Sequence, residues 1–187
     1  MKNIFFITSL FFSSSVISQN TLPVDTIKYK ALQPAGYKDT NINFKPFSSF
    51  STNGIKYTTD KLLSKITFIN FWFEGCPPCI AEFAALNNLY NKYKKNKDFQ
   101  FLSFTFENSE DALRIAGKYH LEYPILLLEK KNIYNLNLNN GFPTTMITDK
   151  SGKISFIKCG GFIEEEKAKQ EVDSLYSKEI ERLLFFK

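Results

Sequence analysis

Two cysteines separated by two residues are the side chains best suited to chemistry in this sequence. Cys76 and Cys79 lie in the segment EGCPPC, which follows an apolar and aromatic run at residues 66–73 and precedes a helical pattern that begins at Pro77. A thiol at the start of a helix lies near unpaired backbone N–H groups and the positive end of the helix dipole, and both stabilise its thiolate. We therefore expect the Cys76 thiolate to attack a disulfide and Cys79 to resolve the mixed disulfide.

Two other interpretations of this pair are open. Zinc would need two more ligands, and the remaining candidates, Cys159 and His120, are isolated and far along the chain. A purely structural disulfide that closes so few residues would restrict the unfolded chain little. Both interpretations are disfavoured, so we expect a redox disulfide between Cys76 and Cys79, with no metal and no cofactor.

Two elements must position these cysteines. The continuous apolar run at residues 66–73 predicts a buried central strand. Residues 77–95 have the period of a helix, and Lys92 and the lysines after it favour its negative C-terminal end. One face of that helix carries Cys79, Glu82, Phe83, Leu86, Leu89, Tyr90 and Tyr93.

The rest of the chain predicts one α/β domain at residues 46–187, preceded by an extended arm at 19–45. Two short alternating runs around Asn53-Gly54 predict a β-hairpin. Residues 129–141 read as a polar connection, and Ser109 as a helix N-cap. Further strands are expected at 99–107, 124–128, Thr144–Thr148 and Lys153–Cys159, and further helices at Ser109–Tyr119 and 164–184.

The first 18 residues have the features of a signal peptide. One lysine precedes an apolar stretch and then small residues, with a cleavage site expected before Gln19. The alternative is an uncleaved membrane anchor. No cysteine occurs before Cys76, so a lipid-modified N-terminal cysteine is not expected. We expect the mature chain to work outside the cytoplasm, in the periplasm or an equivalent compartment, where disulfides persist.

Composition excludes several other classes of protein. The chain has 187 residues and a net charge of +5, but only Arg114 and Arg182 are arginines, which argues against a nucleic-acid site. Three cysteines are too few for a disulfide-dense scaffold. The single histidine, His120, argues against a histidine-rich metal site and is expected to be a solvated turn residue.

Three segments together resemble a known family. INFWFEGCPPC, the following EFAAL and the later GFPTTMITDKSGKI are similar to the thioredoxin fold and, more narrowly, to the exported TlpA/ResA-like thiol-disulfide oxidoreductases. The resemblance covers most of residues 46–187. It implies an α/β, thioredoxin-like fold, with a central mixed β-sheet flanked by helices and an added N-terminal β-hairpin.

The resemblance also implies roles for particular residues. Pro143 matches the cis-proline of the family, which faces the dithiol; with Phe142 and Thr144 it would offer backbone to an extended substrate. Asn70 stands where thioredoxin carries a buried aspartate, so that proton carrier is missing.

Glu82 matches a glutamate that TlpA-like proteins keep, and its position has a physical logic of its own. It follows Cys79 by three residues on the same helical face, beside Phe83. Burial there should raise the pKa of its carboxyl group and suit it to exchange a proton with Cys79. The alternative is a surface glutamate with a solvated head.

The sequence departs from the family directly before the first cysteine. Gly75 stands where the family often has tryptophan, and Glu74 adds a negative charge that would oppose thiolate formation. We expect Trp72 to be a packing residue and Arg114 to have no obvious partner. Cys159 is expected to be a buried small hydrophobe; a reactive third thiol and an intermolecular bridge are the alternatives.

These features predict an exported thiol-disulfide oxidoreductase that reduces, rather than oxidises, disulfides of partner proteins. The resemblance implies a link to cytochrome c maturation and an upstream membrane or extracytoplasmic electron donor. We expect a monomer. The alternatives are a thiol peroxidase of the peroxiredoxin type, disfavoured because Cys-x-x-Cys replaces its Thr-x-x-Cys site, and a non-catalytic thioredoxin-fold binding module.

Overall fold

The computed structural model describes residues 37–185 of the chain. The expected signal peptide and most of the expected arm lie outside these residues. The elements follow in the order β1 (Tyr37–Asn43), β2 (Ser48–Phe50), β3 (Lys56–Thr58), η1 (Thr59–Leu62), β4 (Ile66–Phe71), α2 (Pro77–Tyr93), β5 (Phe99–Thr105), α3 (Ser109–Tyr119), β6 (Ile125–Leu127), α4 (Lys130–Leu136), β7 (Thr144–Thr148), β8 (Lys153–Cys159), α5 (Glu165–Glu171), η2 (Val172–Tyr176) and α6 (Ser177–Phe185).

A six-stranded mixed sheet organises the fold. Its strand order is β1-β8-β7-β4-β5-β6; β4 pairs in parallel with β5 and antiparallel with β7. All six residues of β4 are buried, because strands flank it on both edges and apolar clusters cover both faces. This explains why its sequence is almost continuously apolar. The sheet with its flanking helices confirms the predicted fold class.

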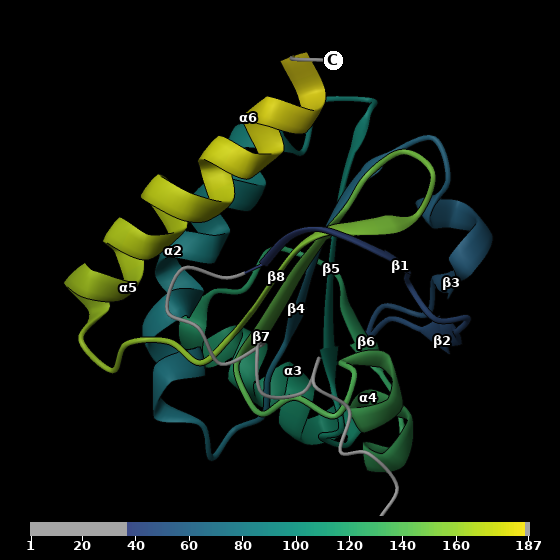
Figure 1. Ribbon diagram of the computed structural model, residues 1–187. Helices are drawn as coiled ribbons and strands as arrows, with labels where there is room; N and C mark the ends of the chain where they lie inside the picture. Colours follow the sequence, from purple (N-terminus) through teal and green to yellow (C-terminus); the bar gives the residue numbers. More distant parts are fainter. Residues whose placement is uncertain (1–36, 186–187) are drawn as a thin grey trace, which may run out of the picture.

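Helices cover both faces of the sheet. On one face, a cluster containing Phe68 and Phe156 packs against α2, α3 and the C-terminal helical segment. On the other face, a second cluster contains Ile69 and Phe104 and includes buried residues of η1 and α4. Figure 1 shows α5 and α6 running alongside α2, so the helix that carries the cysteines is covered by the end of the chain.

The predicted N-terminal hairpin is present as a two-stranded sheet, β2-β3. It is attached to the β6 edge of the main sheet, where Ser49 donates a hydrogen bond to the Leu127 carbonyl at 2.7 Å. Directly before β2, Phe47 meets Phe104 of β5 edge to face, with ring centroids 5.1 Å apart. The hairpin therefore protects a sheet edge and extends the second apolar cluster.

Three features differ from the predictions. Strand β1 lies within the predicted arm and pairs with β8, so the sheet begins before residue 46. The predicted polar connection contains α4, because Ile133 and Leu136 at helical spacing are both buried. Asn108, not Ser109, caps α3, and its side chain accepts a hydrogen bond from the Asp111 N–H at 2.9 Å.

The C-terminal helix is interrupted where the sequence predicts one continuous amphipathic helix. A π-helical turn, η2, separates α5 from α6, and it places Val172 and Tyr176 in the core. Within residues 37–185, no helix is both long enough and apolar enough to cross a membrane.

Removing the Phe104 ring should destabilise the protein. Phe104 is fully buried and contacts the rings of Phe44, Phe47 and Phe71. Phe104→Ala should lower the free energy of unfolding by about 3–5 kcal/mol, measured by urea denaturation. Phe50→Ala is the control, because Phe50 is 58% exposed, and its cost should stay within about 0.5 kcal/mol. Equal costs for the two variants would contradict this description of the core.

Candidate active site

The two cysteines form a disulfide at the junction between β4 and α2. Cys76 occupies the N-cap of α2, and the Cα atoms of Cys76 and Cys79 are 5.3 Å apart. Proline fits the first helical turn because that turn needs no N–H from it. Cys76 is 3% exposed and lies between the exposed Gly75 and Pro77, whereas Cys79 is 1% exposed on the buried face of α2. Cys76 is therefore the cysteine that lies nearer the exposed loop.

The proline loop lies directly beside this junction. Thr144 pairs with Phe71, the last residue of β4, so Pro143 lies next to the point where the chain leaves the sheet toward Cys76. The Phe142–Pro143 peptide bond is cis, as predicted. Pro143 is buried, and its carbonyl accepts a hydrogen bond from the Gly160 N–H at 2.8 Å. Thr144 is buried and donates its hydroxyl to the Gly141 carbonyl at 2.6 Å.

Aromatic side chains connect the two loops. Phe142 meets Phe73 edge to face at 5.2 Å and also contacts Phe106 and Tyr134. The Phe73 ring also lies against Gly75, where a Cβ atom would come within 3.0 Å of it. The position before Cys76 has glycine because the Phe73 ring already fills the space that a side chain would need.

Glu82 is completely buried below these loops. A Cβ atom on Gly161 would lie 2.8 Å from Oε1 of Glu82 and 3.2 Å from the Pro143 ring, so Gly161 lies between the two. Neither carboxyl oxygen has a hydrogen-bond partner among the described residues. Burial, helped by the negative charge of Glu171 and opposed by Lys158, raises the pKa of Glu82 to about 8. The prediction of a desolvated carboxyl group is confirmed, and a solvated surface glutamate is ruled out.

Asn70 and Trp72 have structural roles at the end of β4. Asn70 is buried, donates a hydrogen bond to the Thr145 hydroxyl at 3.1 Å, and lies close enough to Glu82 to favour its charged form. Trp72 is buried, meets Phe83 edge to face, and donates its indole N–H to Ser103 at 3.3 Å. The expectation that Trp72 packs, and does not contact substrate, agrees with this burial.

A buried ion pair that the sequence did not predict lies near Glu82. Lys158 of β8 and Glu171 of α5 have side chains only 5% exposed, and their charged atoms are 2.9 Å apart. The sequence of β8 did indicate that Lys158 is buried. Lys158 follows Phe156 by two residues, and side chains two residues apart on a strand share one face, here the inward one. A lysine at such a position indicates a buried partner.

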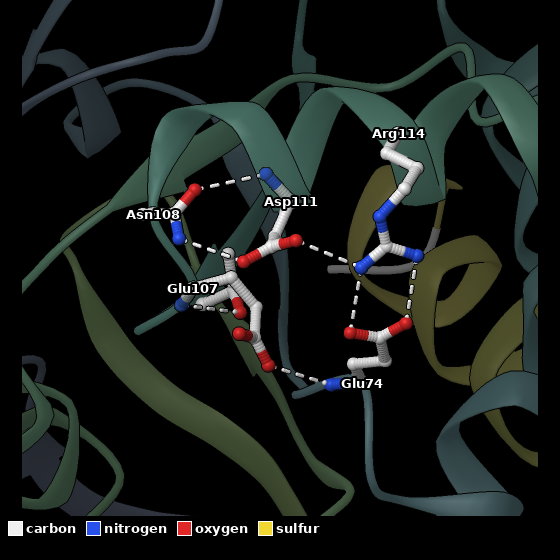
Figure 2. A network of polar contacts seen from close by, with 6 residues as sticks. Glu74, Glu107, Asn108, Asp111 and Arg114 are labelled. Carbon is white, nitrogen blue, oxygen red and sulfur yellow. Dashed lines mark hydrogen bonds and ion pairs between the residues drawn. The ribbon is translucent and has the colours of Figure 1, made fainter.

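A second polar network holds the exposed residues before Cys76 (Figure 2). The Arg114 guanidinium forms two hydrogen bonds with the Glu74 carboxylate, both at 2.8 Å, and a third with Asp111. The Glu74 backbone N–H donates to Glu107 at 2.8 Å. The expectation that Arg114 has no partner was wrong, because α3 places it opposite a loop 40 residues earlier in the chain. The hydrogen bonds from Arg114 lower the pKa of Glu74, so the charge at position 74 is present but paired.

Cys159 and His120 lie outside the dithiol. Cys159 is a half-buried free thiol next to Gly141, so it is less buried than predicted. His120 is exposed and ends α3 in the left-handed conformation, as expected of a turn residue. Within the described part of the chain, no three His, Cys, Asp or Glu side chains are grouped to hold a metal ion.

Comparison with known proteins assigns the family. The model of the Redoxin family matches residues 37–175, which include the dithiol, the cis-proline and Glu82. The chain belongs to the Redoxin family. Within it, the resemblance to TlpA/ResA-like proteins of the thioredoxin superfamily is confirmed by the relatives that the chain matches.

Two Redoxin relatives illustrate this similarity. Thioredoxin-like protein YneN of Bacillus subtilis is 34% identical over 123 residues, which are 64% of this chain and 71% of YneN. The thiol-disulfide oxidoreductase ResA of Bacillus cereus is 30% identical over 102 residues, or 54% of this chain and 58% of ResA. The chain thus matches less than two thirds of the length of that ResA. The Cys76–Cys79 disulfide of this chain is the group that thiol-disulfide exchange requires.

Solved structures support the fold. The thioredoxin domain of a thiol-disulfide oxidoreductase from Bacteroides vulgatus aligns with a TM-score of 0.60 at 22% identity, covering 71% of this chain and 94% of that domain. A thioredoxin-family thiol:disulfide interchange protein from Chlorobium tepidum aligns with a TM-score of 0.59 at 19% identity, covering 74% of this chain and 99% of that protein. At these identities the likeness establishes a thioredoxin-like fold.

Removing Arg114 should make the Cys76 thiolate harder to form in this Redoxin protein. Arg114→Gln leaves the Glu74 carboxylate without its cation, and that charge lies two residues from Cys76. The pKa of the Cys76 thiol in the reduced protein should rise at low ionic strength, and should rise less in salt. The pH dependence of iodoacetamide alkylation measures it.

Two variants control this experiment. Adding Glu74→Gln to Arg114→Gln should return the thiol pKa to its native value or below, because the unpaired carboxylate is then gone. Lys118→Gln removes another cation of α3 that has only a minor influence on Glu74, and its effect should be smaller. A native alkylation profile for Arg114→Gln at low salt would show that the network does not influence Cys76.

Proposed function

We propose that this chain is an exported enzyme that reduces disulfide bonds of partner proteins with its Cys76–Cys79 dithiol. The observation that carries the proposal is the placement of Cys76 at the N-cap of α2, beside the cis-proline and with Cys79 one turn behind it. Thiolate at that position is favoured by the helix N-terminus. Membership in the Redoxin family and similarity to ResA proteins support the same chemistry.

The reaction has two exchange steps. The Cys76 thiolate attacks one sulfur of the partner disulfide, which forms a mixed disulfide and releases a partner thiolate. The Cys79 thiolate then attacks the Cys76 sulfur and releases the second partner thiolate. The partner gains two electrons and, after protonation, two protons; the enzyme is left with its Cys76–Cys79 disulfide.

Glu82 serves the second step in this proposal. Cys79 must lose its proton before it attacks, and Glu82 is the buried carboxyl group three residues further along the same helix. In the oxidised protein a pKa of about 8 keeps Glu82 protonated at neutral pH. In the reduced enzyme the ionised Glu82 carboxylate accepts the proton of Cys79; the proton stays on Glu82 in the oxidised enzyme and returns to Cys79 when the enzyme is reduced again.

Partner contact would involve Phe142, Pro143 and Thr144, which lie beside the dithiol. Phe142 is only half-buried, although three aromatic rings surround it, so part of the ring is free to meet a partner. We place the enzyme outside the cytoplasm as a monomer, re-reduced by a membrane or extracytoplasmic dithiol donor. Apocytochrome cysteines in Cys-x-x-Cys-His motifs are the partner class that we propose.

A defined peptide tests this function. A synthetic peptide with an oxidised Cys-x-x-Cys-His segment should be reduced stoichiometrically by the reduced protein, followed by mass spectrometry. Cys79→Ser should stop at a mixed disulfide on Cys76, whereas Cys76→Ser should form none and Cys159→Ser should react normally. A reductant should also have a potential below about −200 mV in glutathione or dithiothreitol buffers. If neither the native protein nor Cys159→Ser reduces the peptide, the result favours a non-catalytic binding module.

Replacing Glu82 should slow exchange without unfolding the protein. Glu82→Gln keeps the shape of the side chain but carries no proton to transfer, so the second-order rate with the peptide should fall about tenfold or more at pH 7. The rate of mixed-disulfide formation in Cys79→Ser should be unaffected by the same change, because that step needs only Cys76. Equal loss in both steps would rule out a role specific to Cys79.

The pH dependence of stability provides an independent check on Glu82. Its folded pKa of about 8 exceeds the ordinary carboxyl value of 4.5, so between these pH values the folded protein holds a proton that the unfolded chain has lost. The free energy of unfolding of the oxidised protein should therefore fall as pH rises through this window, by up to about 1.4 kcal/mol per pH unit. Glu82→Gln should lack this decline. If the free energy of unfolding depends on pH in the same way in Glu82→Gln and in the native protein, the raised pKa of Glu82 is contradicted.

A further inference from the structure

The buried pair Lys158–Glu171 has no place in the exchange chemistry described above. The Lys158 ammonium group donates to both carboxylate oxygens of Glu171 at 2.9 Å and to the Gly160 carbonyl at 2.7 Å. Tyr176 donates its hydroxyl to Glu171 at 3.2 Å. Both charged groups are thus fully engaged by hydrogen bonds inside the layer between the sheet and the helices.

Stability is a poor reason for such a pair. Transferring two charges out of water costs several kcal/mol for each ion, and well-packed apolar residues in place of a buried ion pair are often equally stable or more stable. A buried pair does, however, act on other buried groups, because the low dielectric of the interior strengthens its field and salt does not screen it. The field of the Lys158–Glu171 pair therefore acts on any buried titratable group that lies close to it.

Glu82 lies within that reach. The Gly160-Gly161 segment connects the two sites: the Gly160 carbonyl accepts a hydrogen bond from Lys158, and Gly161 lies against the Glu82 carboxyl group. Helix α5, which carries Glu171, runs along α2, which carries Glu82 (Figure 1). Lys158 also positions the loop above Glu82, because the N–H of the same Gly160 donates to the Pro143 carbonyl.

The groups that face Glu82 come from several elements. Lys158 belongs to β8, Glu171 to α5 and Tyr176 to η2, and Tyr123 precedes β6. Burial, and secondarily the charge of Glu82, raises the pKa values of both tyrosines well above their ordinary value, so the tyrosines stay neutral. The two charges that can bias Glu82 are therefore those of Lys158 and Glu171.

We propose that Lys158 and Glu171 are positioning residues that control the charge state of Glu82 through opposite electrostatic effects. The negative charge of Glu171 favours the protonated form of Glu82, and the positive charge of Lys158 favours the ionised form. We expect Glu171 to have the larger effect of the two. This proposal rests on the role of Glu82 in the proposed function, but it makes a separate statement about how the buried site titrates.

Three variants at these two positions should shift the titration of Glu82 in a fixed order. Lys158→Gln removes the cation and leaves a second buried carboxylate, so the midpoint should rise by about one pH unit. Glu171→Gln removes the anion and frees Lys158 to attract Glu82, so the midpoint should fall by about as much. The double variant removes both effects, and its midpoint should lie between those of Glu171→Gln and the native protein.

The midpoint can be measured directly on the full oxidised protein. The carboxyl carbon of ¹³C-labelled Glu82, assigned by its absence in Glu82→Gln, is followed by NMR from pH 5 to pH 10. Lys158→Arg is the conservative variant: it keeps the charge and should keep the midpoint near its native value. The order Lys158→Gln, native, double variant, Glu171→Gln, from highest to lowest midpoint, supports the proposal.

A purely structural pair would behave differently. If the pair is purely structural, both single variants should have a lower melting temperature, but the Glu82 midpoint should stay unchanged or move in the same direction in both. Either result for the midpoint overturns the proposal. If the single variants do not fold, the double variant still decides, because no unpaired charge is buried in it. A double-variant midpoint at or above the native value overturns the proposal.

The outcome is separable from that of the proposed function. If the midpoints follow the predicted order but Glu82→Gln exchanges disulfides at the native rate, the electrostatic pair stands and the proton-transfer role of Glu82 fails. If Glu82→Gln is slow but the midpoints do not move, the role of Glu82 stands and the pair is structural. If both hold, the pH at which the exchange rate changes should shift among the variants in the same order as the midpoints.

Discussion

The structure depends on one constraint: a reactive sulfur must lie where a fully buried strand ends and a helix begins. Strand β4 has neighbours on both edges and apolar clusters on both faces, so its end is held in place by the whole core. Cys76 follows as the N-cap of α2, where the positive end of the helix dipole favours its thiolate. Strand pairing also determines where Pro143 lies, because Thr144 is opposite Phe71. The cis-proline thus lies beside the dithiol as a consequence of strand register.

The same arrangement forces polar groups into the interior. Cys79 is on the buried face of α2, so any group that exchanges a proton with it must also be buried, and Glu82 is at helical spacing to do so. A buried carboxyl group is costly when charged, which favours its protonated form. Asn70, Lys158 and Glu171 are further buried polar residues in this layer. Cys79 and Glu82 are thus shielded from solvent, whereas Cys76, itself only 3% exposed, lies between the exposed residues Gly75 and Pro77.

Local patterns allowed most of the fold to be predicted. The buried strand, the cysteine helix and the β7–β8 hairpin follow from apolar runs, helical periodicity and turn residues. Helix α4 was missed because its asparagine-rich sequence has weak helical propensity, and only the burial of Ile133 and Leu136 makes it a helix. Strand β1 was missed because its pairing partner, β8, comes more than 110 residues later. Such contacts follow from tertiary structure and have no local signal.

In the candidate site too, some residues could be predicted from a local pattern and others depend on tertiary contacts. Cys76, Cys79 and Glu82 share one local segment, so spacing alone brought them together. Arg114 and Lys158 act on that segment from elements far away in the sequence. No local pattern connects them to it, although the inward position of Lys158 on β8 was a visible signal.

These two distant contributions differ in a way that separates their effects. Arg114 and Glu74 are about half exposed, so water and salt screen the network before Cys76. Lys158 and Glu171 are almost completely buried, so ionic strength has little influence on the field they exert at Glu82. The electrostatic environment of Cys76 is therefore sensitive to ionic strength, whereas that of Glu82 is insulated from it. In the function we propose, a change in ionic strength therefore alters the attack by Cys76 and leaves the resolving step, which depends on Glu82, almost unchanged.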